Sequence, residues 1–233
     1  MAVVTGGASG IGAATVQRLV DGGWRVAVLD RAAEPGVHLQ VDVRDGDAVA
    51  AAFTEVCDRW GDVDAVVHCA AIAQRGESVA ELSVDQFREL VDVDLVGSYA
   101  VARAAADAMR TGGGAIVLVS SGSGIRARRG MAGYGAAKAG VIHLTKLLAV
   151  ELGSAGIRVN CVSPGVTLTP LMLDAWGAAD SDQAFAMADA QAPIPIGRLV
   201  TADEVAAAAC YLVSPDAGAI TGHNLVVDGG RSL

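Results

Sequence analysis

The sequence has no uninterrupted apolar run that approaches the ~20 residues needed to cross a bilayer as a helix, although 52% of its residues are hydrophobic. Its opening segment, MAVVTGGASG, also lacks the basic stretch and the long apolar core of a secretory signal peptide. These two absences argue against a membrane-spanning or exported chain. They predict a soluble, cytoplasmic protein.

Cysteine and histidine are scarce, with four residues of each type. The cysteines stand far apart at Cys57, Cys69, Cys161 and Cys210, no CxxC pair occurs, and no HExxH motif is present. This argues against a disulfide framework and against a bound metal ion. We expect most of the cysteines to be small residues of the core.

Basic residues are outnumbered, with 17 Lys and Arg against 26 Asp and Glu and a formal net charge of -9. An acidic surface repels a phosphate backbone, so nucleic acid is not an expected partner. Internal repeats, low-complexity tracts and linkers are also lacking. The 233 residues suit one α/β domain spanning 1–233.

What the sequence does contain is a regular alternation of two patterns. Short β-branched runs typical of strands occupy residues 2–5, 25–30, 39–43, 64–70, 114–121, 157–164 and 224–230. Alanine-rich helical patterns occupy residues 11–23, 47–61 and 139–156 between them. The strands are apolar on both faces, as parallel strands covered by helices are. The alternation predicts a doubly wound parallel sheet with helices on both of its faces.

One long segment, residues 166–198, lacks strand character. Its composition favours helices, and its position predicts an insertion over one edge of the sheet. Insertions of this kind often serve as lids. We therefore expect a helical substrate lid at about 166–198.

A glycine-rich turn, VVTGGASGIGAA, follows the first strand and opens the first helix. Gly6, Gly10 and Gly12 fall where such a turn needs positive φ, close approach to phosphate, and tight helix packing. Ser9 and Ile11 complete the turn, whose free amides would face a pyrophosphate at the positive end of the helix. The turn predicts a dinucleotide-binding site.

An acid stands at the end of the next strand, where Asp30 closes RVAVLD and Arg31 follows it. A carboxylate at this place can accept both hydroxyls of an adenosine ribose and repels a 2′-phosphate. By itself Asp30 is equally well explained as a strand-end turn residue. Together with the glycine turn it favours NAD over NADP as the cofactor.

The stretch MAGYGAAKAG places Tyr134 and Lys138 four residues apart, on one face of a helix. Two interpretations compete for this pair. One is an amphipathic helix with a half-buried tyrosine and a lysine whose amine reaches water, which this segment alone favours. The other is a catalytic pair, and the motifs elsewhere in the chain favour this second interpretation.

The order TGxxxGIG, then YxxxK, resembles the short-chain dehydrogenase/reductase family over essentially the whole chain. The resemblance implies a Rossmann fold and hydride transfer between NAD(H) and a secondary alcohol or its ketone. Tyr134 would be the general acid/base, and Lys138 would bind the nicotinamide ribose and lower the tyrosine pKa. Ser121, thirteen positions before Tyr134, would hydrogen-bond the substrate oxygen. Lowering the pKa of a phenol from about 10 to near neutral pH requires a shift of ~3 units, or roughly 4 kcal/mol.

The same resemblance implies further cofactor contacts. Asp42 and Val43 match the pair that holds the adenine amino group. Residues 160–165, from Asn160 to Pro164 and Gly165, match the segment beneath the nicotinamide, and they are followed by Val166 and Thr169 at its carboxamide. The resemblance also implies a homotetramer assembled through helices at 84–109 and 132–153 and the C-terminal segment.

The chain departs from the family pattern in two places. The family sequence N-N-A-G reads HCAA at residues 68–71, so Cys69 replaces an asparagine, Ala70 is kept, and Ala71 adds a methyl group near the cofactor path. The fourth catalytic residue, an asparagine in the family, is Asp94. An ionised Asp94 would pair with Lys138 and blunt its effect on Tyr134. Alternatively, Asp94 serves only as a hydrogen-bond acceptor, and its replacement of the asparagine changes the site little.

Arginines accumulate near the expected substrate site, with Arg126, Arg128 and Arg129 between the serine and the tyrosine, and Gln74 and Arg75 after the fourth strand. They indicate either an anionic substrate or surface arginines paired with acids. Three alternatives to an NAD-dependent alcohol dehydrogenase stay open. They are an NADPH-linked 3-oxoacyl or polyketide-type ketoreductase, a dihydrodiol dehydrogenase (2,3-dihydro-2,3-dihydroxybenzoate-like), and a dinucleotide-binding protein without turnover.

Overall fold

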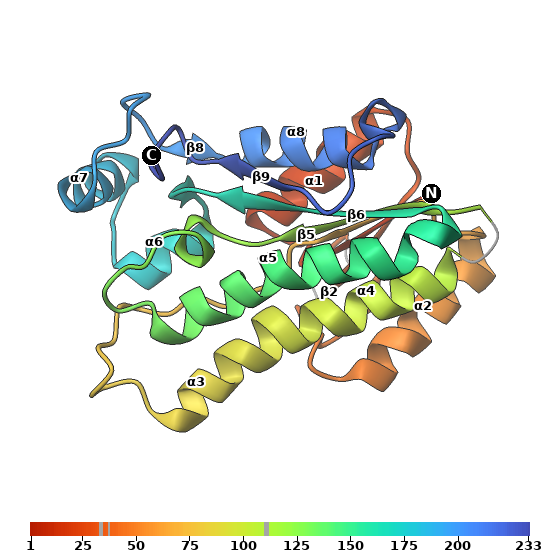
Figure 1. Cartoon of the computed structure of the whole chain (residues 1–233), viewed down its shortest axis with the longest axis horizontal. Coiled ribbons are helices and arrows are strands. Elements are labelled where there is room, and N and C mark those ends of the chain that lie inside the picture. The colour runs from red at the N-terminus through yellow and green to blue at the C-terminus, as the bar shows by residue number, and fades with distance from the viewer. Residues whose placement is uncertain (33–34, 37, 110–111) are drawn as a thin grey trace.

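The computed structural model describes residues 1–32, 35–36, 38–109 and 112–233. Its centre is a parallel sheet of seven strands in the order β3-β2-β1-β4-β5-β6-β9 (Figure 1). The strands are β1 (Ala2–Thr5), β2 (Val26–Asp30), β3 (Leu39–Gln40), β4 (Ala65–His68), β5 (Gly114–Val119), β6 (Ile157–Pro164) and β9 (Asn224–Val227). The predicted doubly wound parallel sheet is confirmed.

Helices cover both faces of this sheet (Figure 1). α1 (Gly10–Asp21) and α8 (Ala202–Val213) pack on one face, and α2 (Gly46–Trp60), α4 (Gly97–Ala108) and α5 (Ala132–Leu152) on the other. The strands are apolar on both sides because each face of the sheet contributes to a separate core. Val3 and Ile116 point into the core under α2, α4 and α5, whereas Val4 and Val117 point into the core under α1 and α8.

The strand expected at 39–43 is shorter than the sequence predicts, since β3 ends at Gln40. The chain turns at Asp42, whose carboxylate accepts hydrogen bonds from the amide and the guanidinium of Arg44. Asp45 then caps α2 by accepting from the amides of Asp47 and Ala48. Local side-chain bonds to the backbone thus end the strand where its apolar pattern continues.

The strand order reverses between β1 and β4, which are neighbouring parallel strands. From β1 the sheet continues to β2 and β3 on one side, and from β4 it continues to β5, β6 and β9 on the other. In a doubly wound sheet a crevice opens at this reversal, beyond the carboxyl ends of the strands. Thr5 and His68 are paired in register at those ends. The fold therefore brings the glycine turn after β1 beside the segment after β4.

Residues 166–198 contain the expected helices, α6 (Pro170–Trp176) and α7 (Ser181–Gln191). The expectation of no strand character was wrong in one detail, because the two-residue β7 (Thr167–Leu168) pairs with β8 (Val200–Thr201). A small apolar cluster that includes Val166, Ala184 and Leu199 packs this segment on itself. It therefore has a core separate from the two cores of the sheet.

A π-helical turn (Asp92–Val96) interrupts one long helix between α3 (Val84–Val91) and α4. The helical pattern at 84–109 does not reveal it. A π turn adds one residue to the turn and rotates the side chains that follow, and such turns occur frequently at functional sites. Here the turn contains Asp94, whose side chain is fully buried.

Two absences hold for the part of the chain that the structure describes. None of its helices is long and apolar enough to cross a membrane. None of its groups of three or more His, Cys, Asp or Glu is arranged to hold a metal ion.

The glycine turn generates a prediction about stability. A Cβ built on Gly12 collides with the carbonyl oxygen of Gly6, which is backbone and cannot rotate away. We expect Gly12→Ala to lower the free energy of unfolding by about 1–3 kcal/mol, the usual cost of overpacking. Gly46→Ala is the matched control, because nothing lies within 4 Å of a Cβ there. Urea unfolding checks this, and equal midpoints for the two variants would contradict it.

Candidate active site

A cavity of about 910 Å³ opens beyond the carboxyl ends of the strands, at the reversal of strand order. Every cofactor-binding residue in the predicted motifs, Asn160 apart, lines it, from Gly6 in the turn to Thr169 before α6. Ser121, Tyr134 and Lys138 line the same cavity. Asp94 does not reach its surface. The fold thus collects residues from almost the whole chain around one space.

The glycine turn has the geometry that a pyrophosphate needs. Gly6 has φ +67°, and a Cβ there would stand 2.5 Å from the amide nitrogen of Ala70, so the turn lies tightly against the segment after β4. Ser9 is the N-cap of α1, and its side chain makes no capping hydrogen bond. The first amides of α1 are therefore left for a ligand, at the positive end of the helix. These features fit a dinucleotide.

Asp30 is held in place at the end of β2. Its carboxylate accepts hydrogen bonds from the amides of Ala8 and Ala32, each at 3.0 Å, so the glycine turn and the strand end are joined through this side chain. Asp30 and the exposed Arg31 both line the cavity. Asp42 lines it too, but Arg44 binds its carboxylate at 2.5 Å and holds the pKa of that carboxyl below its usual range. An adenine amino group would have to share Asp42 with Arg44.

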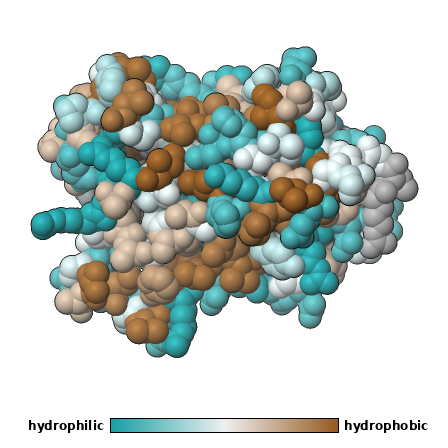
Figure 2. Space-filling view, in the orientation of Figure 1, coloured by the Kyte–Doolittle hydropathy of each residue, from teal (hydrophilic) through white to brown (hydrophobic). Residues whose placement is uncertain are grey.

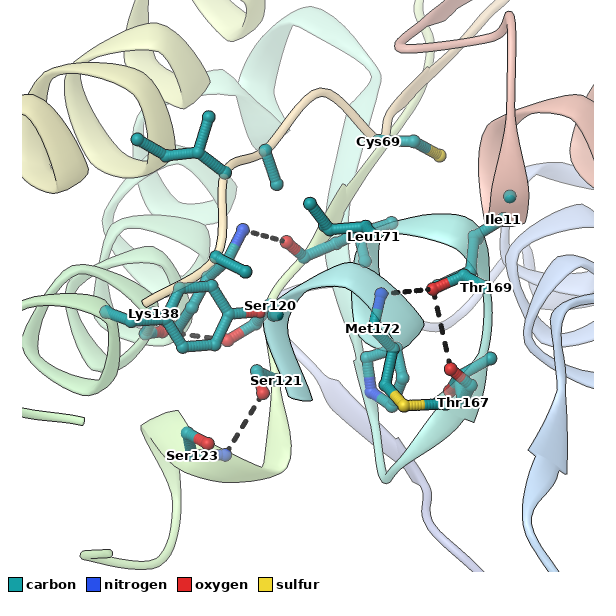
Figure 3. Close-up of a pocket in the computed structure, with 18 of the residues that line it drawn as sticks. Ile11, Cys69, Ser120, Ser121, Ser123, Lys138, Thr167, Thr169, Leu171 and Met172 are labelled. Carbon is teal, nitrogen blue, oxygen red and sulfur yellow. Dashed lines mark hydrogen bonds between the residues drawn. The ribbon is translucent and has the colours of Figure 1, made fainter. Parts of the chain in front are cut away.

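A buried ion pair stands behind the cavity. The ammonium of Lys138, 1% exposed, lies 3.0 Å from Oδ1 of Asp94, which is 0% exposed. The same ammonium donates to the carbonyl oxygen of Val119 at 3.0 Å (Figure 3). Its nitrogen lies 5.6 Å from the centre of the Tyr134 ring. The tyrosine and the lysine do share one side of α5, and the carboxylate approaches the lysine from the π turn.

The proton affinities of these three groups are coupled. Burial raises the pKa of Tyr134 above its usual 10, and the Asp94 carboxylate adds to that rise, whereas Lys138 and a hydrogen bond with Ser121 lower it. Burial lowers the pKa of Lys138, but Asp94 and Tyr134 together outweigh burial, and the net pKa is raised. Burial raises the pKa of Asp94 against the opposing effect of the ammonium. The lysine acts on the phenol in the predicted direction, but the chain's own groups leave the phenol less acidic than a free tyrosine.

Ser121 follows β5 and faces the cavity (Figure 3). Its hydroxyl oxygen accepts from the amide of Ser123 at 3.1 Å, which caps a short helical turn at Gly122–Gly124. The neighbouring Ser120 points the other way and donates to the carbonyl oxygen of Lys138 at 2.8 Å (Figure 3). Ser120 therefore ties the end of β5 to α5, and Ser121 caps the turn that follows, with its hydroxyl in the same cavity as Tyr134.

Gln74 has a role that the sequence analysis missed. It was expected at the substrate entrance, and it lines the cavity, but its side chain is nearly buried and its amide oxygen accepts from the amides of Gly133 and Tyr134 at 3.1 and 3.2 Å. The N-cap of α5 is Met131, which cannot accept these bonds. The lack of a capping side chain at Met131 indicates that a residue from elsewhere in the chain caps α5. Gln74 thus fixes the helix end that carries Tyr134.

The HCAA segment places an unusual histidine behind the site. His68 is 1% exposed, its Nδ1 lies 2.7 Å from the hydroxyl of Thr5, and its Nε2 has no partner among the described residues. Burial, with the nearby Lys138, lowers the pKa of His68 to about 3. Burial raises the pKa of the Cys69 thiol to about 12. Both side chains are therefore neutral at physiological pH, and the thiol is inert.

The expected position of Asn160 is corrected, and for Arg75 the structure favours the alternative of an arginine paired with an acid. Asn160 does not line the cavity. It is fully buried, donates to the carbonyl oxygen of Ile220 at 2.8 Å and accepts from the amide of His223 at 3.0 Å, so it holds the connection into β9. Arg75 lines the cavity but pairs with Asp174 of α6 at 2.7 Å. Its charge is already matched by an acid.

The chain is similar to known proteins over nearly its whole length. The family model described as Enoyl-(Acyl carrier protein) reductase matches residues 6–232. Cis-4-hydroxycyclohexanecarboxylate dehydrogenase of Sinomonas cyclohexanicum is 39% identical, with 99% of this chain and 95% of that protein covered. D-threitol dehydrogenase of Mycolicibacterium smegmatis is 36% identical, with 100% and 93% covered. The structure of 3-ketoacyl-(acyl-carrier-protein) reductase from Brucella melitensis, complexed with NADH, is 30% identical with a TM-score of 0.89, and 100% and 98% are covered.

The buried histidine generates a prediction about pH. In the folded state the pKa of His68 is about 3, against 6.5 in the unfolded chain, so the unfolded chain binds a proton first as pH falls. The contribution of His68 to stability is present above pH 6.5 and is lost as pH falls towards 3. Relative to His68→Asn, we expect the wild type to lose about 2 kcal/mol more of its free energy of unfolding between about pH 7.5 and pH 5. Urea unfolding at both pH values measures this, and parallel losses would contradict the assignment.

Proposed function

The chain belongs to the short-chain dehydrogenase/reductase family, and from this premise we propose that it transfers a hydride between NAD(H) and a secondary alcohol or its ketone, with Tyr134 as the general acid/base. Its relatives are oxidoreductases that act on CH–OH groups. The observation that carries the proposal is one cavity lined by the glycine turn together with Ser121, Tyr134 and Lys138.

Each catalytic side chain has a part that its contacts support. The phenolate of Tyr134 accepts the proton of the substrate hydroxyl in oxidation and returns it in reduction. Ser121, which lines the cavity together with that phenol, binds the same substrate oxygen. Lys138 donates to the carbonyl oxygen of Val119 and forms an ion pair with Asp94, which leaves a donor for a ribose hydroxyl. When bound, the oxidised nicotinamide supplies the hydride acceptor and a positive charge beside the phenol.

NAD is the cofactor we propose over NADP. The Asp30 carboxylate is fixed by two backbone amides at the edge of the cavity, where it can accept ribose hydroxyls. It would repel a 2′-phosphate at the same place. Arg31 is adjacent but exposed, and its guanidinium does not replace the carboxylate that the amides hold. The proposal therefore rests on the position of Asp30.

We extend the proposal to the organisation of the chain. Residues 1–233 form one dinucleotide-binding and catalytic domain, with the segment at about 166–198 as a lid over the substrate. Met172 and Trp176 of α6 and Met187 of α7 line the cavity, so the lid offers an apolar wall to a small alcohol. Its separate core lets it move as a unit.

A homotetramer is proposed on the same basis. Apolar residues gather on the face over α5 and the long helix of α3 and α4 (Figure 2). Val150 and Leu147 of α5 are 83% and 49% exposed, and Tyr99 of α4 is 49% exposed. A continuous apolar face of this kind fits a two-fold contact with a second copy. The C-terminal segment would supply the second contact.

Tyr134→Phe tests the proposed reaction directly. The change removes the proton acceptor and keeps the ring, so we expect kcat/KM for secondary alcohols with NAD to fall at least about 100-fold. Binding of NADH, followed by its fluorescence, should persist in the variant. Unchanged turnover in a panel of alcohols would contradict the role of the phenol. NADH binding without turnover in the wild type would instead indicate a dinucleotide-binding protein.

Asp94→Asn tests the electrostatic role of the ion pair. The Asp94 carboxylate raises the pKa of Tyr134, so removing its charge lowers that pKa and extends activity towards lower pH. We expect the wild type to reach half of its maximal kcat/KM at a higher pH than the variant. The pH profiles of kcat/KM measure this. Coincident profiles would favour the alternative in which Asp94 is a plain acceptor.

A further inference from the structure

Three guanidinium groups gather in the part of the cavity under the lid. Arg126 and Arg128 come from the segment between β5 and α5, and Arg231 comes from the C-terminal segment. All three line the cavity together with Ser121 and Tyr134. The cations therefore belong to the same space as the proposed catalytic groups, although Arg231 stands more than a hundred residues after the other two arginines in the sequence.

Neutral groups fix the position of these arginines. Arg231, 9% exposed, donates to the carbonyl oxygens of Ala188 and Ala192 at the end of α7, at 2.7 and 3.2 Å. Arg126 donates to the carbonyl oxygen of Arg231 at 3.2 Å. The three segments are thus joined by bonds that orient the arginines without neutralising them.

Arg128 is held by two neutral side chains of the lid. It donates to the amide oxygen of Gln191, and its guanidinium lies 5.8 Å from the centre of the Trp176 ring. Stacking on an aromatic ring keeps the planar guanidinium in one orientation. One face and part of one edge are therefore occupied, and the remaining donors are left for a ligand.

The positive charge of the cluster is not matched by acids. Among the described residues, none of the three arginines has a carboxylate oxygen within 4.0 Å, whereas Arg18, Arg75 and Arg198 each have one. Burial and the other two arginines lower the pKa of Arg231 to about 10. In a chain with 26 acidic and 17 basic side chains, three neighbouring cations without an acid are a costly arrangement.

Two acids lie close enough to raise the pKa of Arg231, and both are engaged elsewhere. Asp228 accepts from the amides of Gly230 and Ser232. Asp189 accepts from the amide of Ile194. Backbone amides thus hold both carboxylates in place, and neither carboxylate comes within 4.0 Å of a guanidinium nitrogen of the three arginines.

We propose that Arg126, Arg128 and Arg231 form a subsite for a carboxylate carried by the substrate, which makes the substrate a hydroxy acid with an apolar body. The inference rests on the proposed function, because it places the carboxylate relative to the hydroxyl that Tyr134 serves. The apolar wall of Met172 and Met187 lies along the same cavity. Guanidinium groups match the two oxygens of a carboxylate and give it short, charge-assisted hydrogen bonds.

Matched substrates measure the subsite. We choose cis-4-hydroxycyclohexanecarboxylate and its methyl ester, which share the ring and the hydroxyl and differ in charge. We expect the wild type to prefer the acid, and the ratio of kcat/KM for acid over ester to fall roughly tenfold or more in Arg126→Gln and in Arg128→Gln. Arg126 is exposed, so its variant is expected to fold. Arg59→Gln on α2, an exposed arginine outside the cavity, removes the same charge and should leave the ratio unchanged.

A binding measurement separates this proposal from the proposed function. Cyclohexanecarboxylate has no hydroxyl to oxidise, and calorimetry with NAD present reports its Kd. We expect Kd to rise roughly tenfold or more in both arginine variants, and not in Arg59→Gln. Binding of this carboxylate without turnover of any alcohol would support the subsite and overturn the proposed function. Turnover of the ester with no preference for the acid, or ratios equal in all variants, would overturn the subsite and leave the reaction standing.

Discussion

The buried pair of Lys138 and Asp94 is the constraint on which the rest of the site depends. An ammonium removed from water is stable only with partners, because the cost of burying an isolated charge exceeds the gain from packing its stem. Lys138 finds them in the Val119 carbonyl at the end of β5 and in the Asp94 carboxylate. The pair therefore joins the central sheet, α5 and the long helix of α3 and α4 at one point. The π turn at Asp92–Val96 is the local departure from regular helix that contains this carboxylate.

This pairing also sets the electrostatic balance of the reaction centre. With an asparagine in the place of Asp94, the ammonium would act on the phenol without an opposing charge. With the carboxylate, the pair is nearly neutral seen from Tyr134, and burial dominates the proton affinity of the phenol. A positive nicotinamide beside the phenol then matters more to this chain than to one with the asparagine.

The sequence predicts those parts of the structure whose physical cause lies within a short stretch of the chain. Apolar runs on both faces predict the buried parallel strands, and the glycine spacing predicts the turn that lies against Ala70. Predictions were incomplete where the cause joins distant segments. The Gln74 oxygen that caps α5 comes from the segment after β4, and no pattern near Met131 names its partner. The short β7–β8 pair likewise depends on contact between the two ends of the lid segment.

The charges along the cavity follow from the same topology. Asp30 stands at the end of β2, and the cationic cluster stands beside α6 and α7 of the proposed lid. Arg231 donates to carbonyls at the end of α7, where the helix dipole is negative, so its charge also stabilises that helix. Because two of its five donors are used there, Arg231 contributes mainly charge, and Arg126 and Arg128 have more donors left for direct bonds. An anion bound to them would therefore contact both the segment between β5 and α5 and the proposed lid, and would join the two.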